Sequence, residues 1–358
     1  MYLAKHHYAI AFAKSGHEVY FLNPPQEKKI KSNIEIIENA EIENLFLINH
    51  FLSFPYKIKF KWIGLFHFFM KFHIKKIEKS IGKDLDLILS FDLGHYYPFK
   101  YFGVKSKKVF FPIDEPLNKT AIKSGDGCDL LFSVTHEIIE KYAHLNVPMY
   151  FTHHGLAEEF IDPPKLEFEK DGKIHVGLSG NWLRKDIDTF CLLKIINENP
   201  EIIFEFWGAY KAKDSNIGGG NDKEVYSFIS KLENKTNVIL HGAVHPKQLA
   251  IEFQRIDVFL ICYDILRDQS KGTNYHKVME YLSTGKVILT NNITTYNRFQ
   301  DLMIMANSRK NNKELPSIFK MIINNLDYYN QTQLINKRKS FAYENLYSKQ
   351  IIEFAKII

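Results

Sequence analysis

Arginine is absent from the first half of this chain of 358 residues, and the first arginine is Arg184. Any guanidinium that binds a phosphate must therefore come from the second half. Cysteine is scarce as well: only Cys128, Cys191 and Cys262 occur, and no two of them form a CxxC pair. This spacing excludes a disulfide framework and a cysteine-rich metal site, and it indicates a reducing compartment.

Long apolar runs are also missing. No stretch of about 18 uncharged apolar residues is present, so we expect no membrane-spanning helix. The N-terminal sequence MYLAKHHYAIAFAKSGHEV lacks a signal-peptide pattern. The net charge of +6 is modest, and the chain has neither zinc-ligand spacing nor a nucleic-acid recognition motif. The sequence therefore predicts a cytoplasmic globular protein with no bound metal and no nucleic-acid partner.

The residues that are present form two series of helical patterns that alternate with short apolar runs. In the first series we expect a helix at 3–15 and strands at 17–22, 86–90, 108–111, 130–134 and 149–152. In the second we expect strands at 174–178, 202–207, 238–241, 258–262 and 287–290, and helices throughout 312–358. Strands separated by helices indicate an α/β fold with parallel βαβ units, and the chain length favours two domains.

A stretch at 161–172, IDPPKLEFEKDG, is rich in proline and charged residues. This composition is typical of a linker. We therefore place an N-terminal domain at 1–160 and a C-terminal domain at 161–340, followed by a helix at 341–358.

The segment 271–292, KGTNYHKVMEYLSTGKVILTNN, has the most specific pattern in the chain. It predicts an amphipathic helix with Lys277 and Glu280 on one face, a helix end at Gly285, and a buried strand directly after it. In an open α/β sheet, ligands bind beyond the carboxyl ends of the strands, where helix N-termini point. Amides of the preceding loop, 270–276, can then bind a phosphate, and Glu280 can reach ribose hydroxyls.

This order of helix, Glu-Tyr-Leu, small residue, Gly-Lys-Val, two hydrophobic residues and Thr resembles the donor-binding segment of GT-B glycosyltransferases, especially the group 1/family 4-like class. The pieces GHEVYFLNPP and FTHHGLAEEF resemble the second strand and the closing segment of a GT-B N-terminal domain. The resemblance implies two Rossmann-like domains with a cleft between them, and a last helix that crosses back to the N-terminal domain. The alternative is an ordinary αβ unit with a surface glutamate.

The resemblance also implies an activity. A hexose would pass from a nucleotide-diphosphate sugar to a glycan or lipid-linked acceptor, in bacterial surface polysaccharide synthesis. Transfer would retain the anomeric configuration and need neither a metal nor a cofactor besides the donor substrate. Two alternatives stay open: a nucleotide-sugar epimerase of the same fold, which uses the donor alone, and a non-catalytic GT-B-like binding subunit.

In this family an Arg and a Lys in the loop after the first strand of the second domain hold the donor diphosphate. Here Lys185 matches the Lys, Asn181 stands where the Arg is expected, and Arg184 can supply the guanidinium. A second acidic residue is expected eight positions before Glu280, where this chain has Gly272. The alternative is that Arg184 and Lys185 are solvated loop charges. The residues predicted to contact the donor are Gly180, Asn181, Arg184, Lys185, Thr273, Asn274, Lys277 and Glu280.

Two further polar residues, Asp92 and His95, follow the strand expected at 86–90. At the carboxyl end of a strand they could hydrogen-bond the acceptor, or act as a general base if the enzyme inverts. The alternative is a polar loop whose side chains only cap neighbouring backbone groups.

The segment 51–80 holds seven Lys, seven Phe and a single acidic residue, Glu78. A basic amphipathic segment rich in aromatic residues is typical of one that lies on an anionic membrane surface, here the inner face of the cell membrane. The alternative is a core-packed helix with a basic side that faces solvent.

The start of the chain departs from the GT-B pattern. These N-terminal domains begin with a short hydrophobic strand and a glycine-containing loop, and only then the helix that leads to Gly-His-Glu-Val. This chain opens directly on that helix. We therefore expect Met1 to be an internal or misassigned start, or the chain to be a truncated form with a gap in its first sheet.

Overall fold

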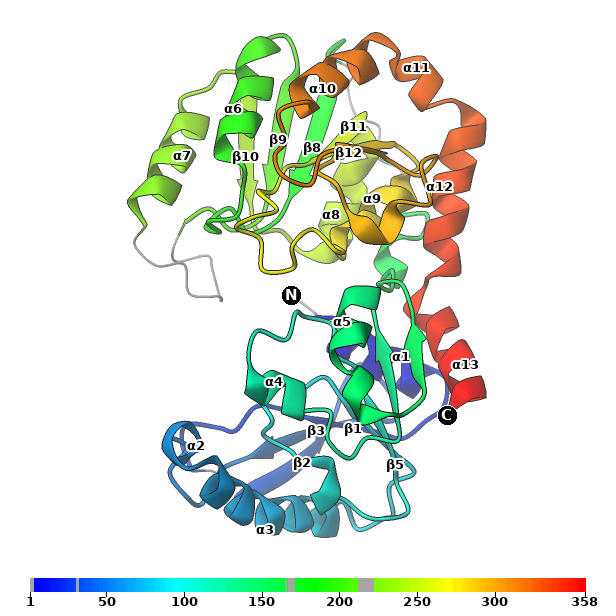
Figure 1. Cartoon of the computed structure of the whole chain (residues 1–358). Helices are drawn as coiled ribbons and strands as arrows, with labels where there is room; N and C mark the ends of the chain where they lie inside the picture. Colours follow the sequence, from blue (N-terminus) through cyan, green and yellow to red (C-terminus); the bar gives the residue numbers. More distant parts are fainter. Residues whose placement is uncertain (1–2, 30–31, 165, 167–170, 212–221) are drawn as a thin grey trace. The chain divides into compact units, whose positions relative to one another are not determined.

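The computed structural model describes residues 3–29, 32–164, 166, 171–211 and 222–358 (Figure 1). The chain forms two compact units. The N-terminal unit consists of residues 3–153 together with the segment 347–358, and the C-terminal unit consists of residues 154–346. Within the predicted linker, positions 165 and 167–170 lie outside the described residues.

The C-terminal unit is built on a six-stranded sheet in which all neighbours are parallel. The order is β10-β9-β8-β11-β12-β13, so that β8 and β11 lie at the centre. Each strand predicted for this half is present, with its bounds shifted by one residue at most. The strands are β8 (His175–Ser179), β9 (Ile203–Trp207), β10 (Val238–Gly242), β11 (Val258–Ile261), β12 (Val287–Thr290) and β13 (Ile304–Met305).

Helices cover this sheet, which is why its strands are continuous apolar runs: every residue of β9, β11 and β12 is buried. They are α6 (Thr189–Glu198), α7 (Lys223–Glu233), α8 (Pro246–Glu252), α9 (Lys277–Thr284), α10 (Leu315–Asn324), α11 (Leu326–Tyr329) and α12 (Thr332–Glu344).

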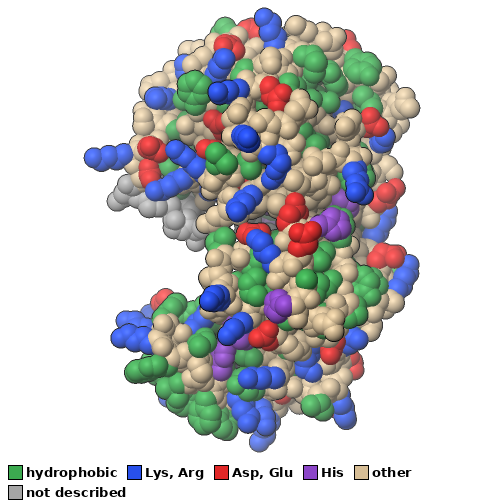
Figure 2. All heavy atoms as spheres, in the orientation of Figure 1, with side chains coloured by type: hydrophobic (Ala, Val, Ile, Leu, Met, Phe, Trp, Pro, Cys, Tyr) green, Lys and Arg blue, Asp and Glu red, His purple; other side chains and the backbone are tan. Residues whose placement is uncertain are grey.

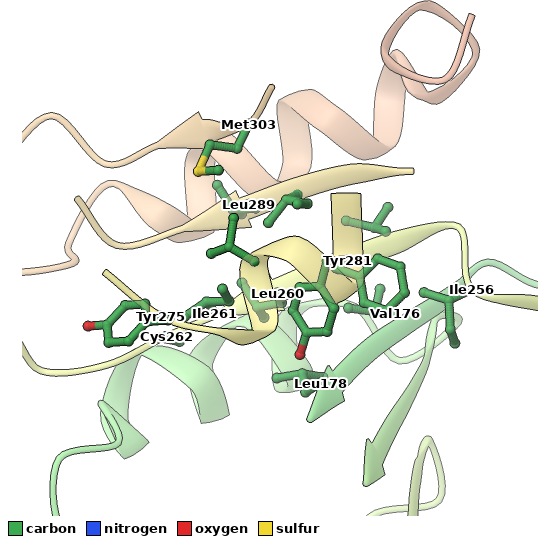
Figure 3. Close-up of a cluster of buried hydrophobic side chains, with 14 of the residues drawn as sticks. Val176, Leu178, Ile256, Leu260, Ile261, Cys262, Tyr275, Tyr281, Leu289 and Met303 are labelled. Carbon is green, nitrogen blue, oxygen red and sulfur yellow. The ribbon is translucent and has the colours of Figure 1, made fainter. Parts of the chain in front are cut away.

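Helix α9 is the predicted helix of the 271–292 segment, and it packs on the sheet through Tyr281. The Tyr281 ring is fully buried and stacks on Phe259 of β11 with the ring centroids 4.2 Å apart. Figure 3 shows Tyr281 beside Val176 and Leu178 of β8. The helix ends at Gly285 as predicted, since this residue has the left-handed φ of 78° that glycine adopts without strain.

The N-terminal unit contains two sheets. One has the order β1-β3-β2, in which β1 and β3 are parallel and β2 is antiparallel. The other has the order β4-β5-β6-β7 and is parallel throughout. The strands are β1 (Val19–Leu22), β2 (Ile34–Glu38), β3 (Leu45–His50), β4 (Leu87–Ser90), β5 (Lys107–Phe110), β6 (Leu130–Ser133) and β7 (Met149–Phe151).

The helices of the N-terminal unit include the C-terminal one, α13, which packs on α1. Tyr8 of α1 is buried, its ring stacks on Phe354 of α13 at 5.5 Å, and its hydroxyl donates to Gln350 Oε1 at 2.6 Å. None of the described helices has both the length and the apolar character needed to cross a membrane. The helices are α1 (Ala4–Lys14), α2 (Ile58–Lys61), α3 (Ile63–Ile81), α4 (Lys119–Lys123), α5 (His136–Lys141) and α13 (Tyr347–Ile357).

Candidate functional site

The carboxyl end of β8 and the first turns of α9 are tied together by side chains of α9. Lys277 is buried, and its ammonium donates to the carbonyl of Ser179 and to the Tyr263 hydroxyl at 2.7 Å. The Ser179 N–H donates to the Tyr281 hydroxyl at 2.7 Å. A Cβ at Gly180 would lie 2.8 Å from the Lys277 ammonium, so any side chain here would displace the end of Lys277.

Glu280 lies one turn after Lys277 in α9 and is partly buried. No residue that the structure describes donates a hydrogen bond to its carboxylate. Burial raises the pKa of Glu280 to about 7, although the Lys277 charge opposes the shift. A partly buried carboxylate whose acceptors take no hydrogen bond from the described residues is available to accept donors from a ligand. Glu280 therefore has the properties expected of a group that binds hydroxyls.

Arg184 follows β8 and lies in the same unit. Its guanidinium binds the Asp186 carboxylate through Nε, at 2.8 Å and 3.1 Å, and through one terminal nitrogen. The same nitrogen is 3.5 Å from Asp268 Oδ1, and the guanidinium lies over the Tyr263 ring at 5.5 Å. The hydrogen bonds from Arg184 to Asp186 raise the pKa of the guanidinium, so its charge is fixed. Because Lys277 also contacts Tyr263, both cations border this ring.

The other two predicted residues of this loop have different surroundings. Lys185 is 71% exposed and pairs with Asp222, the N-cap residue of α7. The amide oxygen of Asn181 accepts the Leu183 N–H at 3.0 Å and shapes the turn. Arg184 and Lys185 are adjacent in sequence but bind different carboxylates, so the structure does not bring them together as one cationic pair.

The loop between β11 and α9 is organised by Asp268, a buried residue that the sequence pattern did not reveal. Its carboxylate accepts the Ser270 hydroxyl at 2.6 Å, the Gly272 N–H at 2.9 Å and the Tyr275 hydroxyl at 2.7 Å. Burial opposes ionisation of Asp268, but these hydrogen bonds outweigh it and lower its pKa. Asp268 therefore holds the loop as a charged anchor. Its contacts come from the fold of the loop, which no spacing rule predicts.

Gly272 stands at the position where the sequence resemblance predicted a second acidic residue, and the backbone there does not suit a side chain. Its φ is 62°, and an added Cβ would lie 2.9 Å from the Asn292 carbonyl oxygen. A side chain here is strained and collides with backbone. Thr273 and Asn274 follow and are both 6% exposed. The Thr273 N–H, which we predicted for phosphate binding, donates instead to the Ser270 carbonyl at 3.1 Å.

Asp92 and His95 lie in the loop after β4, in the N-terminal unit. The Asp92 carboxylate accepts the N–H groups of Gly94 at 2.7 Å and Tyr96 at 2.5 Å. Burial raises the pKa of Asp92, and these hydrogen bonds lower it in part. Burial and the neighbouring His67 lower the pKa of His95 to about 4. This geometry favours the alternative in which Asp92 caps the loop, and such a histidine is a weak general base at pH 7.

Comparisons with known proteins find likeness in structure. No protein-family model and no curated protein sequence matches the chain. A sucrose-phosphate synthase from Thermosynechococcus elongatus is 10% identical with a TM-score of 0.69, covering 98% of this chain and 91% of that one. The trehalose-6-phosphate synthase OtsA is 11% identical with a TM-score of 0.66, covering 100% and 95%. Anabaena Alr3699/HepE in complex with UDP and glucose is 12% identical with a TM-score of 0.58, covering 88% and 87%.

Identities this low carry information on the fold alone. The coverage extends over both units, and all these structures are glycosyltransferases of one architecture. The chain therefore has the GT-B fold, as its 271–292 segment predicted.

Proposed function

We propose that the chain is a glycosyltransferase whose C-terminal unit binds a nucleotide-diphosphate sugar. The observation that carries this proposal is Glu280: a partly buried carboxylate that receives no hydrogen bond from any described residue, one turn from a buried Lys277. A ribose has two neighbouring hydroxyls that can donate to such a carboxylate. Similar structures hold UDP and glucose, or UDP-2-fluoro glucose, which supports this class of donor.

The cations around Tyr263 suit the diphosphate. The Lys277 ammonium has three N–H groups, of which Ser179 and the Tyr263 hydroxyl take two, so one is left for a phosphate oxygen. Arg184 adds a guanidinium that is 44% exposed. A leaving nucleoside diphosphate develops negative charge, and cations fixed in advance stabilise it without reorganisation. We propose that this stabilisation drives a hexosyl transfer that retains the anomeric configuration and needs neither a nucleophile of the protein nor a metal.

The first prediction concerns Arg184. Arg184→Ala removes one cation and leaves Asp186 and Asp268 facing the diphosphate, so affinity for UDP should fall at least tenfold, about 1.4 kcal/mol. Affinity for uridine, which has no phosphate, should stay within twofold. Calorimetric titration with UDP, GDP, dTDP and CDP identifies the base, and the tightest of them then replaces UDP in the comparison. Lys194→Ala on α6, which removes a cation that is 49% exposed and so comparable to Arg184, is the control.

The same titrations distinguish the alternatives. Binding of no nucleotide by the intact chain would contradict the proposal and favour a non-catalytic subunit. Conversion of a bound nucleotide sugar to its epimer without any acceptor would favour the epimerase. If Arg184→Ala lost as much affinity for uridine as for UDP, the assignment of Arg184 to the phosphates would be wrong.

For the acceptor we propose a glycan or a lipid-linked glycan of the bacterial surface, reached at the cytoplasmic face of the membrane. The support is the surface of α2 and α3. Phe60 is 72% exposed, Trp62 63%, Phe68 52% and Phe72 51%, whereas Phe66 on the opposite face of α3 is buried. Figure 2 shows hydrophobic side chains and Lys side chains gathered over these helices. The exposed face of α3 thus supports the membrane expectation for the 51–80 segment, and its buried face supports the alternative of core packing.

The second prediction tests this face. The protein should sediment with vesicles that contain anionic phosphatidylserine and stay in solution with neutral phosphatidylcholine vesicles. Phe68→Ser/Phe72→Ser should reduce the sedimented fraction at least fivefold, because these rings bury the apolar area. The control is Phe190→Ser on α6, which removes a more exposed ring from the C-terminal unit. If the unmodified protein, Phe68→Ser/Phe72→Ser and Phe190→Ser sedimented equally, the membrane proposal would be wrong and α3 would serve core packing alone.

A further inference from the structure

Two of the three cysteines lie together in the C-terminal unit, next to an aspartate. Cys191 is in the first turn of α6, Asp188 is the N-cap residue of this helix, and Cys262 directly follows β11. The two Sγ atoms and a carboxylate oxygen of Asp188 all lie within 4.8 Å of one another. Cys128, in contrast, lies in the N-terminal unit. The fold therefore brings together two thiols and a carboxylate that are far apart in the sequence and match no metal-binding spacing there.

These distances suit a tetrahedral ion. Zinc binds thiolate sulfur at about 2.3 Å and carboxylate oxygen at about 2.0–2.2 Å, so neighbouring ligand atoms in such a site are about 3.5–3.8 Å apart. Ligand atoms that already lie within 4.8 Å of one another can reach this arrangement with shifts of about 1 Å. The main-chain carbonyl oxygen of Asn312 accepts the Cys191 thiol at 3.4 Å and offers a fourth ligand.

Neutral donors hold the Asp188 carboxylate in place. Its Oδ1 accepts the Cys191 N–H at 3.0 Å, and its Oδ2 accepts the side-chain amide of Asn312 at 2.9 Å. Each carboxylate oxygen has a second lone pair, which remains available to a metal. Hydrogen bonds of this kind orient the ligating carboxylate in metal sites. Because Asp188 is only partly buried, an ion can reach the two buried sulfurs from its side.

Asn312 adds a buried acceptor that has no donor. The residue is 2% exposed, and besides Asp188 its Nδ2 donates to the Tyr263 carbonyl at 2.8 Å. Its Oδ1 accepts no hydrogen bond from any residue that the structure describes. An unsatisfied polar atom in a folded protein calls for an explanation, and a bound ion with its water is one of them. The two thiols therefore lie in polar surroundings, unlike cysteines that only fill core volume.

We propose that Asp188, Cys191 and Cys262, with the carbonyl oxygen of Asn312, form a binding site for one zinc ion. Thiolate ligands favour zinc over magnesium and calcium, which prefer oxygen alone. The ion takes the place of the two thiol protons, which pass to solvent. It connects the start of α6 to the residue after β11 and to the segment before α10. Its role is structural, and it takes no part in the proposed sugar transfer.

The test uses the full-length chain, stripped of metal by a chelator and kept reduced by a phosphine. Titration with Co²⁺, which takes the place of Zn²⁺ in tetrahedral sites, should give one equivalent of bound ion and a thiolate-to-cobalt charge-transfer band in the near ultraviolet. Cobalt that binds only to surface histidines gives no such band. Added Zn²⁺ should abolish the band at one equivalent, because it competes for the same ligands.

Substitutions assign the ligands. Cys191→Ala and Cys262→Ala should each weaken Co²⁺ binding at least a hundredfold, whereas Cys128→Ala, which removes the third buried thiol, should leave the band and the affinity unchanged. Asp188→Asn keeps an N-cap residue of equal quality and should weaken binding at least tenfold. Its matched control is Asp222→Asn, the N-cap residue of α7, which should change the affinity less than twofold.

Stability gives a second measurement. Saturating Zn²⁺ should raise the melting temperature of the unmodified protein and of Cys128→Ala by about 5 °C, and should leave that of Cys191→Ala unchanged. Lack of a charge-transfer band in the reduced, unmodified protein would overturn the proposal. A band that survives in both Cys191→Ala and Cys262→Ala, or that disappears in Cys128→Ala, would also overturn it.

Discussion

Glu280→Gln should weaken the binding of both UDP and uridine by tenfold to a hundredfold, about 1.4–2.7 kcal/mol. The reason is that both ligands carry the ribose that we assign to this carboxylate. A glutamine keeps one acceptor oxygen but loses the charge that makes the hydrogen bonds strong. Arg184→Ala, in contrast, should weaken the binding of UDP and leave the affinity for uridine nearly unchanged. The pair of variants therefore assigns ribose and diphosphate to different residues by the same calorimetric titration.

The same substitution should make the protein more stable at neutral pH. Burial raises the pKa of Glu280 from its ordinary value of 4.5 to about 7 in the folded state. Between these pH values the folded protein binds more protons than the unfolded one, so its free energy of unfolding falls as pH rises. Glutamine does not titrate, so the variant does not lose this stability as pH rises. The advantage of Glu280→Gln should therefore grow between pH 4.5 and 7 to about 3 kcal/mol and level off above pH 7.

Urea denaturation at several pH values measures this difference. Glu198→Gln is the matched control, because Glu198 is 54% exposed on α6 and makes one surface ion pair with Lys194. Its effect on stability should be within about 0.5 kcal/mol and independent of the ligand. Loss of binding together with loss of stability in Glu280→Gln would mean that the carboxylate holds the fold, and the ribose assignment would be wrong.

The sequence predicted those elements whose signal is local. Strands β8 to β12 are apolar runs between helical patterns, and each lies where the pattern placed it. Strands β2 and β3 were not predicted. In β2 the run Ile34–Glu38 contains two glutamates and is mostly exposed, because this strand forms the outer edge of its sheet. Its pairing partner is β3, so the signal for the hairpin lies in the contact between them and not in either run alone.

The candidate site divides in the same way. Lys277 and Glu280 lie one turn apart on one helix, as the local pattern predicted, and Gly285 ends that helix as expected. Asp268 was missed, although it accepts more hydrogen bonds in this loop than any predicted residue, since its donors come from a loop with no regular period. Arg184 and Lys185 are neighbours in sequence but pair with different carboxylates, which their adjacency in the sequence does not reveal.

Arg338→Met should give the largest loss of stability, about 3–5 kcal/mol, because it leaves three carbonyl oxygens without a donor and each buried unsatisfied acceptor costs roughly 1–3 kcal/mol. Arg338 lies on α12, is 1% exposed, and donates to three carbonyl oxygens: Leu302 at 3.2 Å, Gly285 at 3.0 Å and Tyr329 at 2.8 Å. Burial lowers its pKa to about 10, but the group stays charged at neutral pH. Methionine fills most of the volume and leaves the carbonyls without donors.

Gly285 is the residue at which α9 ends, so Arg338 also places a positive charge at the carboxyl end of the helix that carries Lys277 and Glu280. A cation there interacts favourably with the helix dipole. The loss should therefore lower the melting temperature of the C-terminal unit by roughly 10 °C, from the usual 2–4 °C per kcal/mol for a unit of this size. Tryptophan fluorescence follows this unit selectively in a Trp62→Phe background, because Trp182 and Trp207 both belong to it.

Lys337→Met is the matched control, since Lys337 precedes Arg338 on α12 but is 53% exposed and makes a surface ion pair with Asp301. It should change the free energy of unfolding by less than about 1 kcal/mol. Comparable losses in the two variants would show that the Arg338 hydrogen bonds contribute no more than a surface pair. A stable Arg338→Met protein with normal UDP binding would also show that α9 keeps its place without this anchor, and the link from α12 to the nucleotide site would be wrong.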